Sequence, residues 1–342
     1  MERHIAELTA AQRRQGVRVT EIYNGGVPTG ESVQVCPNLH TYLLRPNVLR
    51  WAVFYSAMLL CRLNFSDGRI PIMHVHGDWH SFIGGRLAAR RFKIGTLAAS
   101  LHEWARAPDS LYRFALGGYA PIFTTGVRDA ERLRRVLGKE PIHLVSAPAD
   151  IFFQRRSENS TPVDVIAAGT VNARKNYELL VECAVKLPQF SFAIYGDGPE
   201  RPRLEALADR MGATNVRFAG AVDRAEIRRS MGTARLLVNT SLAEGSPTVA
   251  LEAMACGLPV VMTPSNDYRF LIDAGVNGIV TYGWSADELA DAIRHFLEHP
   301  ERLARSAKAA REAAAPHRWE QKARIVTEAM IAAVRASKTI SE

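Results

Sequence analysis

The chain has 342 residues, of which 47% are hydrophobic and 23% charged, and this balance excludes a mainly disordered or fibrous protein. Its net charge of +8 suits an anionic partner such as a nucleotide, a phosphorylated substrate, a membrane surface or a nucleic acid. The four cysteines form no C-x-x-C pair, which argues against a zinc ribbon or a disulfide scaffold and favours a reducing cytoplasm. The apolar run Trp51–Cys61 is shorter than the roughly 20 residues of a membrane span, and the polar first residues do not read as a signal peptide.

The first half of the chain alternates between helix-like and strand-like runs. A helix is predicted over residues 2–15, because Ile5 and Leu8 share a face and Gly16 can end the helix. Strands are predicted over 17–23, 70–74, 94–100, 121–125 and 141–145, and further helices over 50–63, 81–91 and 128–137. A doubly wound domain normally opens with a buried strand and a glycine turn, so this domain is predicted to lack its opening strand.

The second half repeats the alternation. Strands are predicted over 163–169, 191–196, 216–220, 234–239, 258–262 and 278–281, and helices over 177–187, 201–211, 224–231, 247–256 and 286–299. This order predicts an α/β protein with two Rossmann-like, doubly wound domains built on parallel sheets. The polar stretch 155–162 ends in proline and separates a domain of residues 1–155 from one of residues 163–315. A last helix over 316–338 carries an apolar stripe from Trp319 to Val334 and should dock on another element.

The loop and helix that follow the strand 234–239 carry the most informative residues. Ser246 is a predicted N-cap and Pro247 suits a first helical turn, so the free amides of residues 245–249 would attract a phosphate. Glu244 and Glu252 stand at the two ends of a short helix, where carboxylates could bind sugar hydroxyls. Spacing alone fits equally well a helix with one N-terminal acid and one ordinary surface glutamate.

The pair Glu244 and Glu252, with the run Ala-Met-Ala-Cys-Gly-Leu-Pro-Val-Val that follows, resembles the signature of the retaining glycosyltransferases of family four, also called glycosyl transferases group 1. These enzymes have the GT-B fold, in which two Rossmann-like domains face each other across a cleft. The likeness covers nearly the whole chain and is most specific in the C-terminal half. Other segments that resemble the family are 147–152, 168–176, 194–200 and 216–220, and Trp319 in the last helix.

The resemblance implies a nucleotide-sugar donor bound by the C-terminal domain, an acceptor-side N-terminal domain and a last helix that crosses back to it. Glu252 would bind the ribose, Glu244 the hydroxyls of the transferred sugar, and Lys175 the diphosphate. The family usually has arginine where this chain has Thr170, so Arg174 is the candidate for the missing cation. Both basic residues could instead be solvated at a helix start. The other donor-binding residues implied are Gly169, Gly196, Gly220, Gly245, Ser246, Pro247, Thr248 and Val249.

A histidine lies just after a predicted strand of the first domain. His102 follows the strand 94–100, at the end where open α/β sheets bind ligands. The resemblance implies that His102 contacts the donor sugar and is catalytic together with Glu244. The alternative is a loop histidine that is hydrogen-bonded to the backbone.

The sequence His-Val-His-Gly-Asp-Trp-His offers a second interpretation. His74 and His76 lie on one face of a strand, and with Asp78 and His80 they nearly match the ligand box of a zinc metallohydrolase, apart from Trp79. The family resemblance implies instead that His76 and Asp78 are acceptor-side residues. Glu2 joins them, because it matches the family's Gly-Gly-x-Glu turn, whose glycines would precede this start.

The resemblance therefore implies a retaining glycosyltransferase, and the lack of an Asp-x-Asp motif in the chain predicts that it needs neither a metal nor another cofactor. The donor would be a nucleoside-diphosphate sugar and the acceptor a hydroxyl of a glycan, a lipid-linked saccharide or a lipid, in cell-surface polysaccharide or glycolipid synthesis. A catalytically inactive binding subunit is the alternative. We expect a cytoplasmic protein that binds no nucleic acid.

Basic patches at 86–91 and 132–135, with the apolar helix 50–63, suggest peripheral binding to the inner face of an anionic membrane. A core helix with solvated arginines is the alternative. Cys183 and Cys256 are predicted to be small buried hydrophobes rather than nucleophiles.

Overall fold

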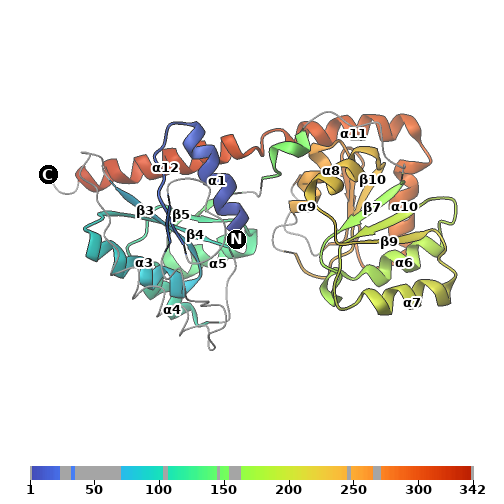
Figure 1. Ribbon diagram of the computed structural model, residues 1–342, viewed down its shortest axis with the longest axis horizontal. Coiled ribbons are helices and arrows are strands. Elements are labelled where there is room, and N and C mark those ends of the chain that lie inside the picture. Colours follow the sequence, from blue (N-terminus) through green and yellow to red (C-terminus); the bar gives the residue numbers. More distant parts are fainter. Residues whose placement is uncertain are drawn as a thin grey trace. The chain divides into compact units, whose positions relative to one another are not determined.

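The computed structural model describes residues 2–23, 32–34, 71–102, 107–144, 147–153, 163–244, 248–264 and 271–339. The chain forms two compact units. Unit 1 comprises Met1–Val145 and Trp319–Glu342, and unit 2 comprises Ser146–Arg318 (Figure 1). The predicted linker 155–162 and the predicted helix 50–63 lie outside the described residues.

Unit 1 is built on a parallel sheet with the strand order β3-β4-β5-β6. The strands are β3 (Ile72–Gly77), β4 (Thr96–Leu101), β5 (Ile122–Thr124) and β6 (Ile142–His143). The helices along the chain are α1 (Glu2–Arg14), α3 (Trp79–Phe92), α4 (Asp109–Leu116) and α5 (Val127–Leu137). The predicted strand 17–23 is reduced to β1 (Glu21–Tyr23), which pairs in parallel with β2 (Ser32–Gln34). The sequence analysis missed α4.

The core of unit 1 packs α3 and α4 against the sheet. Phe82 of α3 and Tyr112 of α4 are fully buried with Leu101 of β4, and the hydroxyl of the buried Tyr119 donates to the carbonyl of Phe82 at 2.7 Å. Buried apolar side chains of this size supply about 1.5–3 kcal/mol each on leaving water. Leu101, the last residue of β4, directly precedes His102, so this packing holds the strand end next to that histidine.

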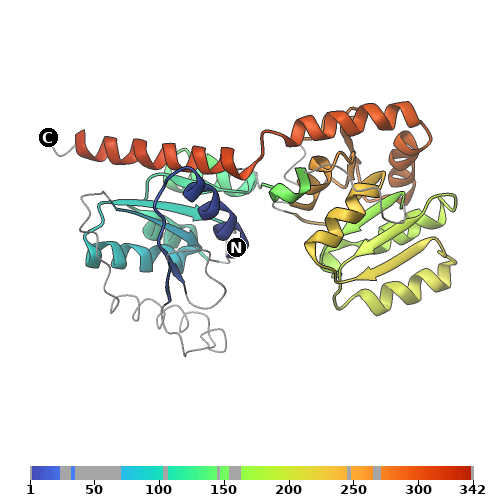
Figure 2. The same ribbon diagram turned by 45° about the horizontal axis from the view of Figure 1, so that its top comes forward.

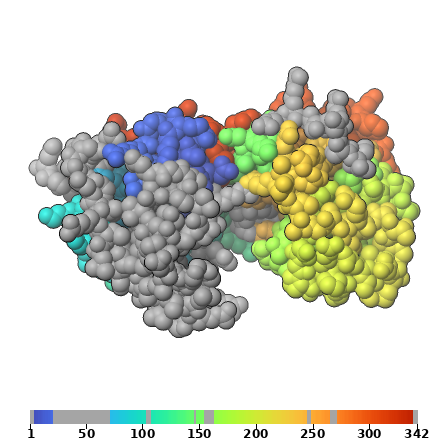
Figure 3. Space-filling model, viewed as in Figure 1, coloured from blue at the N-terminus to red at the C-terminus, as the bar shows by residue number. Residues whose placement is uncertain are grey.

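The last helix, α12 (Trp319–Thr339), belongs to unit 1 and lies beside α1 in both views (Figures 1 and 2). Its stripe is buried at Trp319, Ala323, Val326 and Met330, so the predicted docking is confirmed. Gln12 of α1 donates to the hydroxyl of Thr327 at 3.3 Å, across the contact between the two helices. The helix α1 itself lies on the outside of the unit, in blue in Figure 3.

Unit 2 is a six-stranded parallel sheet with the order β12-β11-β10-β7-β8-β9. The strands are β7 (Val165–Ala168), β8 (Phe192–Tyr195), β9 (Val216–Gly220), β10 (Leu236–Asn239), β11 (Val260–Met262) and β12 (Gly278–Val280). The helical segments are η2 (Asp150–Phe153), η3 (Ala173–Lys175), α6 (Tyr177–Val185), α7 (Arg201–Met211), α8 (Arg224–Thr233), α9 (Thr248–Ala255), α10 (Ala286–Leu297) and α11 (Pro300–Ala314). The predicted doubly wound α/β architecture is confirmed in this unit.

Helices cover both faces of this sheet. Val165 and Ala167 of β7 pack into one core cluster with α6 and α10, and Ile166 packs into another with α9 and α11. Near-continuous apolar strands are the pattern expected of a parallel sheet buried on both sides. Cys183 lies in the first cluster and Cys256 in the second; both are buried, as predicted.

We predict that Gly196→Ala destabilises unit 2 by about 3 kcal/mol or more, because the added methyl group overpacks a closed backbone contact. Gly196 follows β8 with φ +143°, and a Cβ there would lie 2.0 Å from the carbonyl oxygen of Gly169. Gly212→Ala is the matched control, since Gly212 also has a positive φ (+69°) but nothing within 4 Å. Strain alone should cost the control about 1–2 kcal/mol. Urea denaturation of both variants measures the difference, and equal losses would contradict the prediction.

Candidate functional site

A charged pair lies at the switch point of the unit 2 sheet. The order places β7 next to β10, and the chain leaves these two neighbouring strands in opposite directions along the sheet, which is where open α/β sheets bind ligands. Lys175 ends the segment that follows β7, and Glu244 follows β10. The ammonium group of Lys175 donates to Oε1 of Glu244, and their side chains are only 12% and 8% exposed. Two predicted site residues are therefore in direct contact.

Backbone and hydroxyl contacts hold this pair in place. Asn172 caps η3 by accepting from the amide of Lys175 at 3.2 Å, and the carbonyl of Lys175 accepts from the hydroxyl of Thr240 at 2.8 Å. Ser241 donates to Oε1 of Glu244 at 3.0 Å. Buried Tyr177 lies nearby, and its pKa is raised by burial and by the charge of Glu244. Each group is anchored to a strand end, so the site is preorganised on rigid elements.

The second predicted cation is more loosely held. Arg174 lies 3.8 Å from Oε2 of Glu244 and donates to the carbonyl of Ala243 at 3.4 Å, while its side chain is 54% exposed. Thr170, at the position of the family's arginine, is exposed. Arg174 therefore lies on the solvent side of the Lys175–Glu244 pair, where it could reach an anionic group.

The second predicted carboxylate lies within the same unit. Glu252 is on the second turn of α9, its side chain is 11% exposed, and Arg224 donates to its Oε1. Arg224 begins α8, directly after Asp223, which caps that helix. Its guanidinium also lies 5.1 Å from the ring centre of Phe152. The structure therefore adds Arg224 to the site. The sequence signal that could have identified Arg224 is its position shortly after β9, because open parallel sheets bind ligands at the carboxyl ends of their strands.

The glycines of the site lie where the strand ends approach one another. The amide of Gly169 donates to the carbonyl of Tyr195, and the amide of Gly196 donates to that of Gly220. Gly196 and Gly169 are so close that only glycine fits. Thr248 and Val249 open α9 and are half-buried. The remaining predicted donor-binding residues, Gly245, Ser246 and Pro247, lie outside the described residues.

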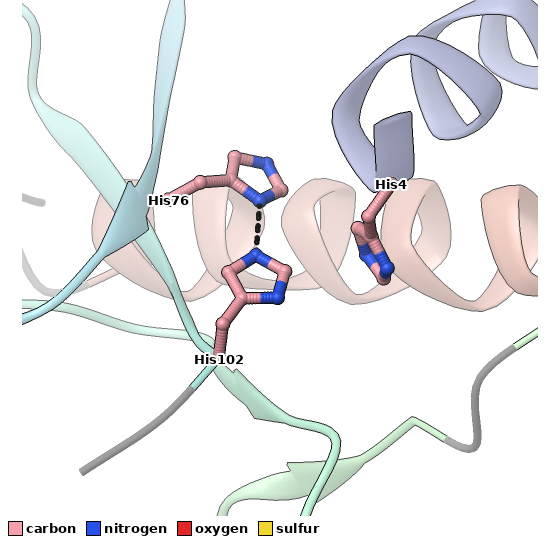
Figure 4. A group of neighbouring side chains, drawn as sticks. All are labelled: His4, His76 and His102. Carbon is pink, nitrogen blue, oxygen red and sulfur yellow. Dashed lines mark hydrogen bonds between the residues drawn. The ribbon is translucent and has the colours of Figure 1, made fainter. Parts of the chain in front are cut away.

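Three histidines of unit 1 lie close together on β3 and just after β4. His76 of β3 and His102, which follows β4, are hydrogen-bonded at 3.1 Å through Nδ1 and Nε2, and their rings are stacked (Figure 4). His74 lies on the same face of β3 and is hydrogen-bonded to the hydroxyl of Ser100 at 2.8 Å. Burial lowers the pKa of all three rings, to about 3 for His74 and about 4 for His102.

Residues from both ends of unit 1 join this group. The ring of His4 in α1 lies 4.7 Å from that of His102 and 5.1 Å from that of Trp319, edge-on to both. Lys322 is one turn further along α12, is 4% exposed, and has a pKa lowered by burial to about 7. The sequence analysis missed His4 and Lys322, because nothing in the local pattern links α1 or α12 to β3. Of Glu2, only its place as the first residue of α1 is described.

The ligand box of a metallohydrolase does not form. Asp78 is the N-cap of α3 and accepts from the amide of His80, whose ring stacks on Trp79 and lies 3.3 Å from the same carboxylate. Helix capping therefore accounts for Asp78 and His80. Within the described ranges, the group of side chains close enough to share a metal ion is His4, His76 and His102.

We predict that unit 1 loses stability as the pH falls from about 6.5 towards 4. His74 and His102 stay neutral in the folded unit, whereas the unfolded chain binds protons below about pH 6.5. Protonation therefore favours unfolding, by at most about 1.4 kcal/mol per pH unit for each histidine and by less where the ring is half-exposed. Lys322 is charged in both states within this window.

Urea denaturation at pH 6.5, 5.5 and 4.5, with a chelator present, measures this loss. The variant His74→Asn should show a shallower pH dependence than the parent chain. His299→Asn, at an exposed position in unit 2, is the matched control and should behave like the parent. Equal slopes for the parent and His74→Asn would contradict the prediction.

Solved structures of the GT-B class match the whole fold. The sucrose-phosphate synthase from Thermosynechococcus elongatus superimposes with a TM-score of 0.80 at 20% identity, covering 97% of this chain and 93% of that one. The Anabaena protein HepE in complex with UDP and glucose gives a TM-score of 0.71 at 18% identity, covering 94% and 95%. The chain therefore has the GT-B glycosyltransferase fold, as predicted.

The family model described as glycosyl transferases group 1 matches residues 149–313, which make up most of unit 2. The alpha-D-kanosaminyltransferase of Streptomyces kanamyceticus is 30% identical over 205 residues, 55% of this chain and 53% of the relative. The D-inositol 3-phosphate glycosyltransferase of Xylanimonas cellulosilytica is 26% identical over 374 aligned residues, covering 94% and 89%. The chain thus spans about half the length of the first of these relatives. Among the helices described here, none combines the length and apolar character that a membrane span requires.

Proposed function

We propose that the chain is a retaining glycosyltransferase that uses a nucleoside-diphosphate sugar. The observation that carries this proposal is the contact between Lys175 and Glu244 at the switch point of the unit 2 sheet. One group is a cation for the diphosphate, and the other is a carboxylate for the hydroxyls of the sugar. The second buried carboxylate, Glu252, suits the ribose. The similarity to HepE, whose structure holds UDP and glucose, supports this donor class.

The reaction forms and breaks one bond at the anomeric carbon of the sugar. The bond from that carbon to the diphosphate oxygen breaks, the acceptor oxygen bonds to the same face of the sugar, and the leaving phosphate takes the acceptor proton. Lys175 and Arg174 stabilise the charge that develops on the diphosphate, so the proposal needs no metal cofactor. His102, at the end of β4, is the proposed contact from unit 1 to the donor sugar.

We propose a hydroxyl of a glycan, a lipid-linked saccharide or a lipid as the acceptor, on the cytoplasmic face of the membrane. A basic surface of unit 1 supports membrane association: Arg86, Arg90 and Lys93 line a pocket of about 350 Å³. Exposed Leu87 lies on α3, beside these basic residues, and exposed Phe114 lies on α4. The guanidinium group of Arg86 lies over the ring of Phe114. Cations beside exposed apolar side chains are typical of interfacial membrane binding.

We predict that the chain co-sediments with vesicles that contain anionic lipid, and that the double variant Arg86→Glu/Arg90→Glu weakens this binding at least about tenfold, at roughly 1 kcal/mol per charge removed and more for reversal. Arg132→Glu/Arg134→Glu is the matched control, because these arginines are paired with Asp109 and Glu140. Equal binding by both variants, or no binding by the parent, would exclude the surface at α3.

The proposed activity is tested by donor binding followed by turnover. UDP-, GDP- and ADP-sugars are screened for an increase in the melting temperature of the chain, because a ligand of the folded state stabilises it. Hydrolysis of the donor found in this way is followed by NMR at early times, and a retaining enzyme releases the sugar in the anomeric configuration of the donor. Binding without turnover would favour the inactive binding subunit, and no binding would contradict the proposal.

A further inference from the structure

Three imidazoles from distant parts of the chain point into one space in unit 1. His4 comes from α1, His76 from β3 and His102 from the end of β4 (Figure 4). One nitrogen atom of each ring lies within 4.8 Å of those of the other two. The parallel register of β3 and β4 pairs His76 with Ser100. His102 follows Ser100 by two residues, so its side chain lies on the same side of the sheet as that of His76. The packing of α1 on α12 then brings His4 to the two strand ends.

This spacing is close to that of ligands around a tetrahedral metal ion. Nitrogen ligands at 2.0–2.1 Å from zinc in tetrahedral geometry lie about 3.4 Å from one another. His76 and His102 are already 3.1 Å apart, and a small movement of His4 closes the set. We propose that His4, His76 and His102 bind one divalent transition-metal ion of the zinc type, with the fourth position open to water or another ligand.

The chemistry of the donor set selects the class of metal. Three imidazoles and no carboxylate suit zinc, cobalt, nickel or copper, whereas magnesium and calcium prefer oxygen ligands. His74 is not part of the set, because its Nε2 is hydrogen-bonded to Ser100. The hydrogen bond between His76 and His102 gives way to two metal bonds when the ion enters. The site therefore differs from the metallohydrolase box in two of its three ligands.

One nearby charge opposes the ion. Lys322 is buried in α12, and its ammonium group lies 5.0 Å from the centre of the Trp319 ring, which in turn contacts His4. The charge of Lys322 disfavours a positive charge on His4, His76 and His102, so it should also weaken the binding of a metal cation in this partly buried site. Removing this charge should therefore tighten metal binding. That is a gain which a misfolded variant cannot imitate.

The site has a consequence that rests on the proposed function. His102 is the proposed contact of unit 1 with the donor sugar, and a metal ion bound to its ring removes it from that role. The ion then inhibits transfer and is not a cofactor. Metal binding and inhibition are measured separately, so that the failure of one is distinguishable from the failure of the other.

Metal binding is tested by titrating the full chain, freed of metal by a chelator, with Co²⁺ and with Zn²⁺. We expect one ion per chain and the visible absorption of tetrahedral cobalt, lost on addition of zinc. His4→Ala should weaken binding by at least about 100-fold, because even an outer partner of a metal ligand is worth 10–100-fold. His299→Ala, an exposed histidine of unit 2, is the matched control and should bind like the parent.

Lys322→Met tests the same site in the opposite direction, with an expected gain in affinity of about threefold or more. The proposal is overturned if the parent binds no ion, or if His4→Ala binds as tightly as the parent. In the activity arm, zinc should inhibit donor hydrolysis by the parent and not by His4→Ala. Stoichiometric metal binding in a chain that hydrolyses no donor would leave the site intact and contradict the proposed function instead.

Discussion

Replacing Glu244 with glutamine is expected to lower the rate of donor cleavage by about 100- to 1,000-fold, the cost of removing one partner that stabilises a transition state. Glutamine keeps the shape of the side chain but not the charge that now neutralises Lys175. The affinity for the free nucleoside diphosphate should stay the same or improve, because Lys175 becomes available to the phosphates. This opposite response of turnover and nucleotide binding is specific to a carboxylate that contacts the sugar.

The measurement is kcat for donor hydrolysis beside the Kd of the free diphosphate. Glu178→Gln is the matched control, because Glu178 is a half-buried acid of unit 2 that pairs with Arg203, and the change should leave both values unchanged. If the Glu244 variant lost nucleotide affinity and turnover to the same extent, a structural role of Glu244 in unit 2 would explain the result better.

Replacing Glu252 with alanine should raise the Kd of the nucleoside diphosphate by about 100-fold. The Kd of the nucleoside-diphosphate sugar should rise by a similar factor. Two hydrogen bonds from ribose hydroxyls to a buried carboxylate, at about 1.5–3 kcal/mol each, account for a loss of this size. Arg224→Met should cause a smaller loss, of about tenfold, since Arg224 orients the carboxylate and does not replace it. This loss should appear in KM rather than in kcat.

Calorimetry measures the Kd of the nucleoside diphosphate for each variant, and steady-state kinetics measure KM and kcat. Circular dichroism checks that the variants are folded. Glu252→Gln keeps a polar partner for Arg224 and should weaken the nucleotide less than alanine does. Glu226→Ala is the control on the same helix as Arg224, because Glu226 pairs with the exposed Arg229. A change of less than about threefold in the alanine variant would place the ribose away from Glu252, since a single charged hydrogen bond is worth more than that.

The resemblance to the glycosyltransferase family singled out Lys175 and Glu244 from the sequence, and the structure brings these two side chains into contact. They follow β7 and β10, whose carboxyl ends meet at one edge of the parallel sheet. The sequence spacing could not predict that Glu244 and Glu252 each form an ion pair, one with Lys175 and the other with Arg224. The contact of Glu252 with Arg224 joins α9 to α8 and depends on how both pack on the sheet.

The sequence predicted unit 1 less well, for two physical reasons. Helix α4 is only eight residues long, and Tyr112, Ala115 and Leu116 owe their burial to α3 and the sheet rather than to a long repeating pattern. The histidine group depends on tertiary contacts between α1, α12 and the strand ends. His76 and His102 were recognised from their positions in strands, but their mutual hydrogen bond and the approach of His4 were not.

Unit 1 is completed by α12, although unit 2 lies between the two in the order of synthesis. During synthesis, α1 and the strands β3–β6 emerge from the ribosome before Trp319 and Val326 of α12 have been made. Domains usually mature in the order in which they are made. In this protein the later-made unit 2 can finish folding first, whereas nascent unit 1 lacks the packing of α12 on α1 until the last helix has left the ribosome.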